Sequence, residues 1–178
     1  MNVIHDLSLG NPPDEINVFI ESPRGSKNKY ETDKDTGLVM LDRVNYGPEV
    51  YPVDYGLIPQ TYWHDGDQLD ALMINSAEPY FPGVVIPSRI IGLVRMIDTG
   101  EADEKLICAP ADDPRLDGLK DLKDIAPHVL KEIKSFFETY KNLAGKKVTV
   151  TEFGDRQAAI KVLDESIELY EKKFGKRK

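Results

Sequence analysis

The sequence contains a single cysteine and no long run of apolar residues, and each absence excludes a class of protein. With only Cys108 available, no internal disulfide can form, so the chain is not a disulfide-stapled secreted module. No stretch approaches the roughly 20 apolar residues that a membrane-spanning helix needs. The first residues, MNVIHDLSLGNPPDE, show no basic region followed by an apolar run, so we expect no signal peptide. These absences predict a soluble, cytoplasmic protein with no membrane partner.

Positive charge is also scarce. The 178 residues carry 31 acidic against 23 basic side chains, which leaves a net charge of −8. A general nucleic-acid binder neutralises phosphates with an excess of Lys and Arg, so this composition argues against a nucleic-acid partner. The length and the hydrophobic content of 40% suit one globular domain, which we expect to span residues 1–178.

Residues 16–109 have the pattern of consecutive β-strands with no helical segment between them. The strand-like stretches are apolar, often β-branched and bounded by Gly, Pro, Asn or Asp: INVFIE, GLVMLDRV, DALMIN, SRIIGLVRMID and KLICAP. This pattern favours an antiparallel barrel or sandwich over a parallel sheet. Cys108 lies in the last stretch, where we expect a small buried side chain rather than a reactive thiol.

The last third of the chain changes to a helical period. From Pro127 onward, one predicted buried face consists of Leu130, Ile133, Phe136, Phe137 and Tyr140. The stretch KKVTVTEF predicts a short strand. Asp155 can then cap a second helix, whose inward face carries Ala159, Val162, Leu163, Ile167 and Tyr170. The sequence therefore predicts a mainly β fold with α (α+β), a barrel with two packed C-terminal helices.

The stretch HDGDQLD crowds three aspartates, Asp65, Asp67 and Asp70, into residues 64–70. Two interpretations are open: a hairpin tip left in water, where repulsion costs little, or a cation that the carboxylates bind. Further acids stand at predicted strand ends or beside lysines, and these are Glu21, Glu31, Asp98 and Asp103. Each alone suits a solvated strand end. Together they suggest a hard divalent cation, which prefers carboxylate oxygens and water.

Two other cation motifs fit poorly. An EF-hand loop that began at Asp65 would need Gly at its sixth position and Glu at its twelfth, where the sequence has Asp70 and Ser76. A zinc site lacks support because the three histidines are far apart in sequence and no cysteine pair exists. We expect His64 to cap or solvate the turn rather than to bind metal.

Basic and phenolic side chains accompany the acids. Lys29, Arg43, Lys105 and Lys141 occur in stretches that are rich in tyrosine and acid. These residues could form ordinary surface salt bridges, which are common and weak. They could instead form a phosphate pocket, in which Arg supplies a planar fork, Lys a point charge and Tyr a hydroxyl donor. Metal-holding carboxylates beside such cations are the arrangement expected for a polyanionic phosphate substrate.

Taken together, these elements resemble the soluble family I inorganic pyrophosphatases, in order and in spacing, from about residue 1 to 174. The matching elements are E21, KYE at 29–31, LDR at 41–43, YPVDYG at 51–56, DGDQLD at 65–70, D98, DEK at 103–105 and YK at 140–141. The short chain is most similar to the prokaryotic branch, archaeal members included. Gln68 replaces the proline usual in the family motif, which bears on the rigidity of the turn. The stretch TEFGDRQAA also lacks the usual Gly-Trp, which bears on packing.

The resemblance implies that pyrophosphate is hydrolysed to two orthophosphates with Mg2+, or with Mn2+ or another divalent ion in its place. It implies a five-stranded OB-like barrel flanked by two C-terminal helices, assembled as a homohexamer. Asp65, Asp70 and Asp103 correspond to ligands of the tighter metal, with Asp70 bridging to a second ion, and Asp98, Glu21 and Glu31 to holders of ions that arrive with substrate. The phosphate grip corresponds to Lys29, Arg43, Tyr55, Tyr140 and Lys141, with Lys105 close by. Asp67 corresponds to the general base for direct attack of a metal-activated water.

Two alternatives stay open beside this interpretation. A non-enzymatic OB-type module for acidic or nucleic partners would need a basic, aromatic face, whereas here the basic residues are interleaved with carboxylates. A phosphohydrolase acting on nucleotides or longer polyphosphates would share the metal and phosphate chemistry. The sequence shows no base-stacking pocket for a nucleotide, and activity on such substrates stays open as a side reaction.

Overall fold

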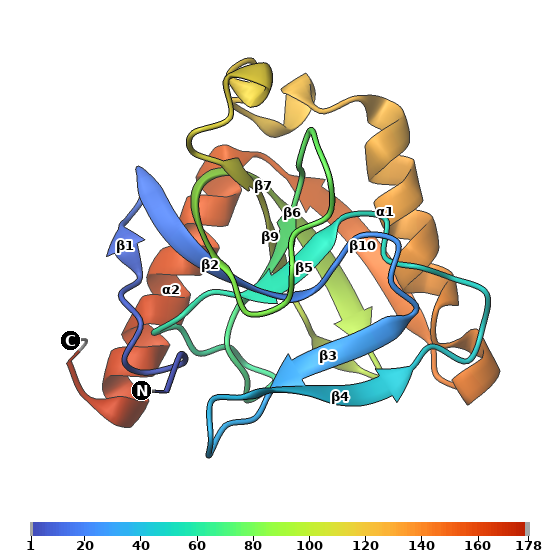
Figure 1. Cartoon of the computed structure of the whole chain (residues 1–178), viewed down its shortest axis with the longest axis horizontal. Helices are drawn as coiled ribbons and strands as arrows, with labels where there is room; N and C mark the ends of the chain where they lie inside the picture. Colours follow the sequence, from blue (N-terminus) through green and yellow to red (C-terminus); the bar gives the residue numbers. More distant parts are fainter. Residues whose placement is uncertain (1, 177–178) are drawn as a thin grey trace.

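In the computed structural model, which describes residues 2–176, strands dominate the chain and five of them close into a ring (Figure 1). Hydrogen-bonded neighbours run in the order β2, β5, β6, β9, β7, and β7 pairs back onto β2. The five strands are β2 (Glu15–Ser22), β5 (Asp54–Leu57), β6 (Asp70–Met73), β7 (Val85–Asp98) and β9 (Lys105–Pro110). The predicted five-stranded barrel is confirmed.

Five further strands extend this ring or lie beside it. On the ring, β1 pairs with β2, while β8 and β10 pair with β7. A separate two-stranded sheet, β3 with β4, forms the antiparallel hairpin at the lower edge of Figure 1. These five strands are β1 (Gly10–Asn11), β3 (Asn28–Thr32), β4 (Val39–Val44), β8 (Glu101–Ala102) and β10 (Val148–Gly154).

One pairing corrects the expectation of an antiparallel barrel, because β6 and β9 run parallel. Their register pairs Asp70 with Lys105 and Met73 with Cys108. An alternating apolar pattern shows that a segment is a strand, but not which strand it pairs with or in which direction. Since parallel neighbours begin at the same edge of a sheet, Asp70 and Lys105 lie side by side at the start of their strands.

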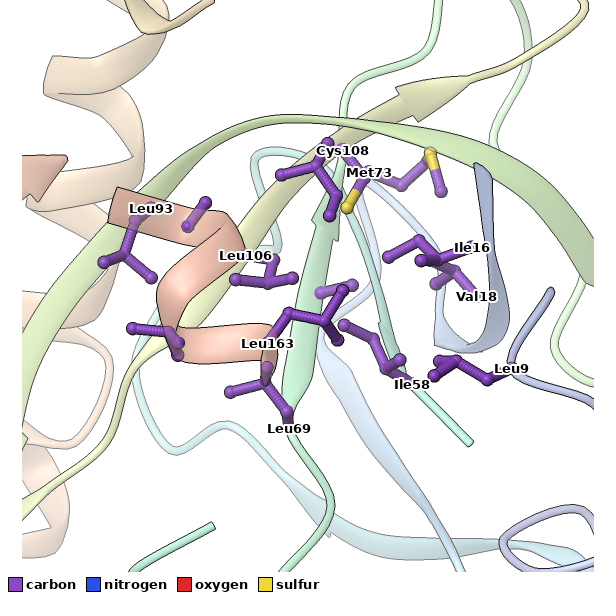
Figure 2. Close-up of a cluster of buried hydrophobic side chains, with 14 of the residues drawn as sticks. Leu9, Ile16, Val18, Ile58, Leu69, Met73, Leu93, Leu106, Cys108 and Leu163 are labelled. Carbon is purple, nitrogen blue, oxygen red and sulfur yellow. The ribbon is translucent and has the colours of Figure 1, made fainter. Parts of the chain in front are cut away.

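The inside of the barrel is a close-packed apolar core, shown in Figure 2. Leu163 of α2 points in among strand residues such as Val18 and Leu106, and all three residues are fully buried. Full burial of a side chain of this size contributes roughly 1.5–3 kcal/mol. Cys108 belongs to the same cluster, and burial raises the pKa of its thiol to about 12. The prediction of a buried cysteine is confirmed.

Two α-helices flank the barrel on opposite sides in Figure 1, as predicted: α1 (Pro127–Thr139) and α2 (Arg156–Phe174). Asp155 caps α2, and its side chain accepts a hydrogen bond from the backbone N–H of Ala158 at 2.8 Å. Short 3-10 turns occupy Pro114–Leu116, Leu122–Asp124 and Asn142–Ala144. Most of the predicted inward residues are buried, namely Ile133, Phe136, Phe137, Tyr140, Ala159, Val162, Leu163 and Tyr170. Leu130 and Ile167 are only partly buried and pack against the edge of the core. Within residues 2–176, no helix is long and apolar enough to span a membrane.

Candidate active site

A cavity of about 210 Å³ lies where β2, β3, β6, β9, the loop after β5 and the end of α1 meet. It gathers side chains that are spread over 120 residues of sequence, so the barrel brings together what the chain separates. Twelve of the predicted site residues line it: Glu21, Lys29, Glu31, Tyr55, Asp65, Asp67, Asp70, Asp98, Asp103, Lys105, Tyr140 and Lys141.

The loop that carries the three aspartates is closed by its own backbone. The N–H of Trp63 donates to the carbonyl of Asp67 at 2.7 Å, and the N–H of Gly66 donates back to the carbonyl of Trp63 at 3.1 Å. Gly66 has φ of 90°, a conformation that glycine adopts without strain. Asp65 Oδ1 accepts from the N–H of Asp67 at 3.0 Å. The turn therefore engages the side chain of one aspartate, Asp65, and is closed without the carboxylates of Asp67 and Asp70.

Helix α2 supports this loop through two contacts whose residues do not line the cavity. The N–H of Tyr62 donates to the carbonyl of Ser166 at 3.0 Å. His64 Nε2 lies 2.8 Å from Glu165 Oε1, so its ring is directed to α2 and does not line the cavity. Half-exposed, His64 is a solvated residue that pairs with the helix.

Lys105 occupies the floor of the cavity between two carboxylates. Its Nζ lies 2.6 Å from Asp70 Oδ2 and 2.6 Å from Asp103 Oδ1, and its side chain is 3% exposed. Burial by itself would lower the pKa of Lys105, but the charges of Asp103 and Asp70 outweigh it and raise that pKa well above the usual range. The hydroxyl of Tyr55 donates a short hydrogen bond to the same Asp70 oxygen. Asp70 is therefore held by two donors at once.

Further ion pairs line the walls. Lys29 contacts Glu31, two residues along β3, and its Nζ also lies 3.5 Å from Asp42 Oδ2. Lys141, which follows α1, contacts Asp98 at the end of β7. Each of these lysines thus faces a carboxylate, so cations and acids alternate around the space.

Two carboxylates in the cavity have too little positive charge around them to offset the effect of burial on their pKa. Burial raises the pKa of Glu21 to about 8, although its Oε1 accepts from the N–H of Thr32 at 2.7 Å. Burial also raises the pKa of Asp65 to about 6, and the nearby charges of Asp70 and Asp103 add to the shift. A carboxylate with a raised pKa gains stability when a cation approaches it.

The donor set fits hard divalent cations. Seven carboxylates line the cavity against four lysines, and neither histidine nor cysteine contributes. Hard ions such as Mg2+ prefer carboxylate oxygens, whereas soft ions prefer thiolate and imidazole ligands. Among the described residues, no three ligand groups already converge on one point, because the ammonium of Lys105 separates Asp70 from Asp103. A cation would share these carboxylates with Lys105.

The sequence analysis missed Lys34, which also lines the cavity. This residue belongs to the turn between β3 and β4, and its Nζ lies 3.0 Å from Asp67 Oδ1. The stretch TDKDTG is typical of an exposed turn, and no local signal in it shows that the hairpin folds over the aspartate loop.

Arg43 is the one predicted site residue that does not line this cavity. Its guanidinium carbon lies 5.9 Å from the centroid of the Tyr140 ring, and its Nη1 lies 2.5 Å from Asp42 Oδ2. It lines an adjoining cavity together with Tyr140 and Lys141. The other amino group, Nη2, is buried and has no hydrogen-bond partner among the described groups. Arg43 therefore has a free donor beside the site rather than inside it.

Fold and site together define a closed β-barrel protein with a charged cavity suited to a polyanion and hard cations. A sequence model described as inorganic pyrophosphatase matches residues 18–171. The inorganic pyrophosphatase of Haloferax volcanii is 46% identical over 177 residues, which cover 98% of this chain and 99% of the relative. That of Picrophilus torridus is 43% identical over 173 residues, or 97% of both chains. This chain belongs to the inorganic pyrophosphatase family.

Solved structures agree with this assignment. The crystal structure of inorganic pyrophosphatase from Thermus thermophilus has a TM-score of 0.90 and 44% sequence identity, and the match covers 95% of this chain and 99% of that one. The protein from Helicobacter pylori gives a TM-score of 0.89 at 42% identity, over 93% and 98% of the two chains. The resemblance to soluble family I enzymes is confirmed, together with the OB-like fold class. The chain is therefore an enzyme, a hydrolase of this family.

Proposed function

We propose that this chain hydrolyses inorganic pyrophosphate to two orthophosphates with the help of divalent cations, Mg2+ in the first place and Mn2+ as a substitute. Family membership supports the substrate. The single observation that carries the rest is the cavity in which seven carboxylates meet four lysines. An excess of acid suits cations, and the lysines among the acids suit the phosphate groups that those cations accompany.

The carboxylates divide into two proposed sets. Asp65, Asp70 and Asp103 hold the tighter ion, with Asp70 shared with a second ion. Their closeness supports this, since the charges of Asp70 and Asp103 both raise the pKa of Asp65. Ions that arrive with substrate are assigned to Glu21, Glu31 and Asp98, which stand on other walls of the same cavity. When bound, the metal offsets substrate charge and lowers the pKa of a coordinated water.

Asp67 is the proposed general base. Its side chain is 55% exposed, and it is free of the turn contact that engages Asp65. A carboxylate that is open to the cavity can accept the proton of an attacking water. The ammonium of Lys34, 3.0 Å from Asp67 Oδ1, holds this carboxylate over the cavity.

The cationic and phenolic side chains form the proposed phosphate grip. Burial raises the pKa of Tyr55 and also that of Tyr140, so both hydroxyls stay protonated near neutral pH and can donate hydrogen bonds. Positive charge aimed at the departing phosphate stabilises the transition state. The group consists of Lys29, Arg43, Tyr55, Lys105, Tyr140 and Lys141.

We also propose that residues 1–178 act as one domain in a cytoplasmic homohexamer that has neither nucleic-acid nor membrane partners. Exposed apolar side chains along β4, among them Met40 and Leu41 at 55% and 54%, suit burial between copies of the chain. Light scattering measures the assembly directly, and a stable monomer would contradict it.

A phosphate-release assay tests the proposed activity. Pyrophosphate, tripolyphosphate and ATP are compared at equal concentration with Mg2+, with Mn2+ and with excess chelator. We expect pyrophosphate to be hydrolysed fastest, and the activity to disappear with chelator. Preference for ATP or tripolyphosphate would instead support the nucleotide or polyphosphate alternative.

A further inference from the structure

A buried hydrogen bond connects the two chain segments that carry the carboxylates of the proposed tighter metal site. The indole Nε1 of Trp63 donates to Glu104 Oε2 at 2.7 Å. The two residues are only 4% and 9% exposed. Trp63 lies two residues before Asp65, and Glu104 directly follows Asp103. Neither side chain lines the cavity, so the bond joins the two segments outside it.

Each end of this bond is fixed to its own segment. On the loop side, the backbone of Trp63 makes both hydrogen bonds that close the aspartate turn, one with Asp67 and one with Gly66. On the strand side, Glu104 Oε1 accepts from Arg95 Nη1 of β7 at 3.2 Å. A movement of the indole would therefore move the aspartate loop, and a movement of Glu104 would move the start of β9.

The chemistry of the pair suggests more than packing. A buried carboxylate is costly unless its oxygens are bonded, and well-packed apolar residues are often as stable at such a position. Here both oxygens of Glu104 are engaged, one by an indole and one by a guanidinium. Asp65 and Asp103 line the same cavity, and two ionised carboxylates that share one space repel each other. A bond between their segments opposes that repulsion.

We propose that Trp63 and Glu104 are positioning residues that hold Asp103 at a fixed distance from Asp65 and Asp70 and so set the affinity of the cavity for Mg2+. The proposal rests on the proposed function, because it concerns the same metal site. Groups that orient ligands without touching the metal commonly affect its affinity 10–100-fold. Holding repelling carboxylates in place before the ion arrives lowers the cost of binding it.

Calorimetric Mg2+ titration of the full chain tests the proposal. Trp63→Phe removes the N–H donor but keeps an aromatic ring, and Glu104→Ala removes the acceptor. We expect each variant to raise the Kd for Mg2+ about tenfold. The Kd of the double variant for Mg2+ should exceed that of either single variant by no more than about twofold, because both changes break the same bond. Glu104→Gln retains an acceptor oxygen for the indole, so its Kd should stay within about threefold of wild type.

Glu152→Gln is the matched control. Glu152 Oε2 lies 3.7 Å from Arg95 Nε, so this variant removes a carboxylate from the same arginine and leaves the Trp63–Glu104 bond in place. Its Kd should equal that of wild type. Phosphate release measured against Mg2+ concentration gives a second readout. Trp63→Phe should need about tenfold more Mg2+ for half-maximal rate and should approach the wild-type rate at saturation.

Three results would overturn the positioning role: a Kd within twofold of wild type in Trp63→Phe, fully additive effects in the double variant, or a rate loss that excess Mg2+ does not restore. Melting curves in chelator show whether each variant folds. If Glu104→Ala does not fold, the Kd values of Trp63→Phe and Glu104→Gln test the positioning role without it. If the wild-type chain itself binds no Mg2+, the proposed function fails, which is a distinct outcome.

Discussion

Lys34 Nζ lies 3.0 Å from Asp67 Oδ1, and this ion pair connects the turn of the β3–β4 hairpin to the loop of three aspartates. The two side chains are 56% and 55% exposed, so solvent screens the pair and its contribution to stability is at most about 1 kcal/mol. Its importance lies in position. The hairpin places a cation beside the proposed general base at the edge of the cavity.

Lys34→Met should therefore lower activity more than stability. We expect kcat/KM for pyrophosphate to fall about fivefold, equivalent to roughly 1 kcal/mol of barrier, while the melting temperature stays nearly unchanged. The control is Lys27→Met, since Lys27 is an exposed lysine near the same hairpin that does not line the cavity. Equal kinetics in the two variants would show that Lys34 is only a solvated turn residue.

Two single substitutions in the aspartate loop separate base from ligand. If Asp70 is shared between two ions, Asp70→Asn should weaken Mg2+ binding, and excess Mg2+ should restore part of the activity. If Asp67 accepts the proton, Asp67→Asn should keep metal affinity and lose about 10²–10⁴-fold in rate. Calorimetry beside rate-versus-Mg2+ curves measures both. Rescue of Asp67→Asn by Mg2+ would reverse the two roles.

Arg43→Lys keeps the charge but removes the planar fork. Arg43 lines the cavity that adjoins the site together with Tyr140 and Lys141, and a guanidinium can offer a phosphate two parallel N–H groups. An ammonium cannot make both contacts, so we expect kcat/KM to fall about tenfold or more. Steady-state kinetics of this variant beside Lys146→Arg, a change at another residue of the adjoining cavity, check the expectation. Wild-type kinetics in Arg43→Lys would assign Arg43 to a surface ion pair.

The stability of the metal-free enzyme should fall as pH rises from about 4.5 to 8. Burial raises the pKa of Glu21 from 4.5 to about 8 in the folded chain, so the folded state binds this proton more tightly than the unfolded state. The contribution is fully present below pH 4.5 and is lost progressively up to pH 8. Melting curves with chelator should show this slope, and Glu21→Gln should reduce it to the part below about pH 6 that the raised pKa of Asp65 contributes.

The exposed Glu78 supplies the control for that experiment, because Glu78→Gln should leave the slope unchanged. Added Mg2+ should raise the melting temperature most at the upper end of the pH range, where the cavity carboxylates are ionised. A melting temperature of the metal-free chain that is constant between pH 5 and 8 would contradict the placement of Glu21 in a cation-poor, buried position.

Two substitutions outside the cavity should leave catalysis intact. His64→Gln changes a side chain that is directed to α2, and Cys108→Ser changes one inside the barrel core. Both should keep kcat within about threefold of wild type, or roughly 0.65 kcal/mol of barrier. Cys108→Ser should still lower the melting temperature, because a hydroxyl in an apolar core costs about 1–3 kcal/mol. A hundredfold loss of activity with the fold intact would show that the chemistry is misassigned.

The features that the sequence determined by itself are those with short-range physical causes. The apolar period of α2 follows from the geometry of a helix, and Asp155 caps that helix through a contact three residues away. The strand KLICAP was predicted with the observed bounds, Lys105–Pro110. The candidate site residues came from residue types in an ordered spacing that resembles a family, and twelve of them line one cavity.

What only the tertiary structure decided are contacts between segments that are far apart in sequence. Parallel pairing of β6 with β9 sets Asp70 beside Lys105, folding of the hairpin sets Lys34 over Asp67, and the bond from Trp63 to Glu104 joins the segments that carry Asp65 and Asp103. No local period records these pairings. They follow from the closure of the sheet into a ring, because a strand's pattern determines which face is buried but not which neighbour the strand meets.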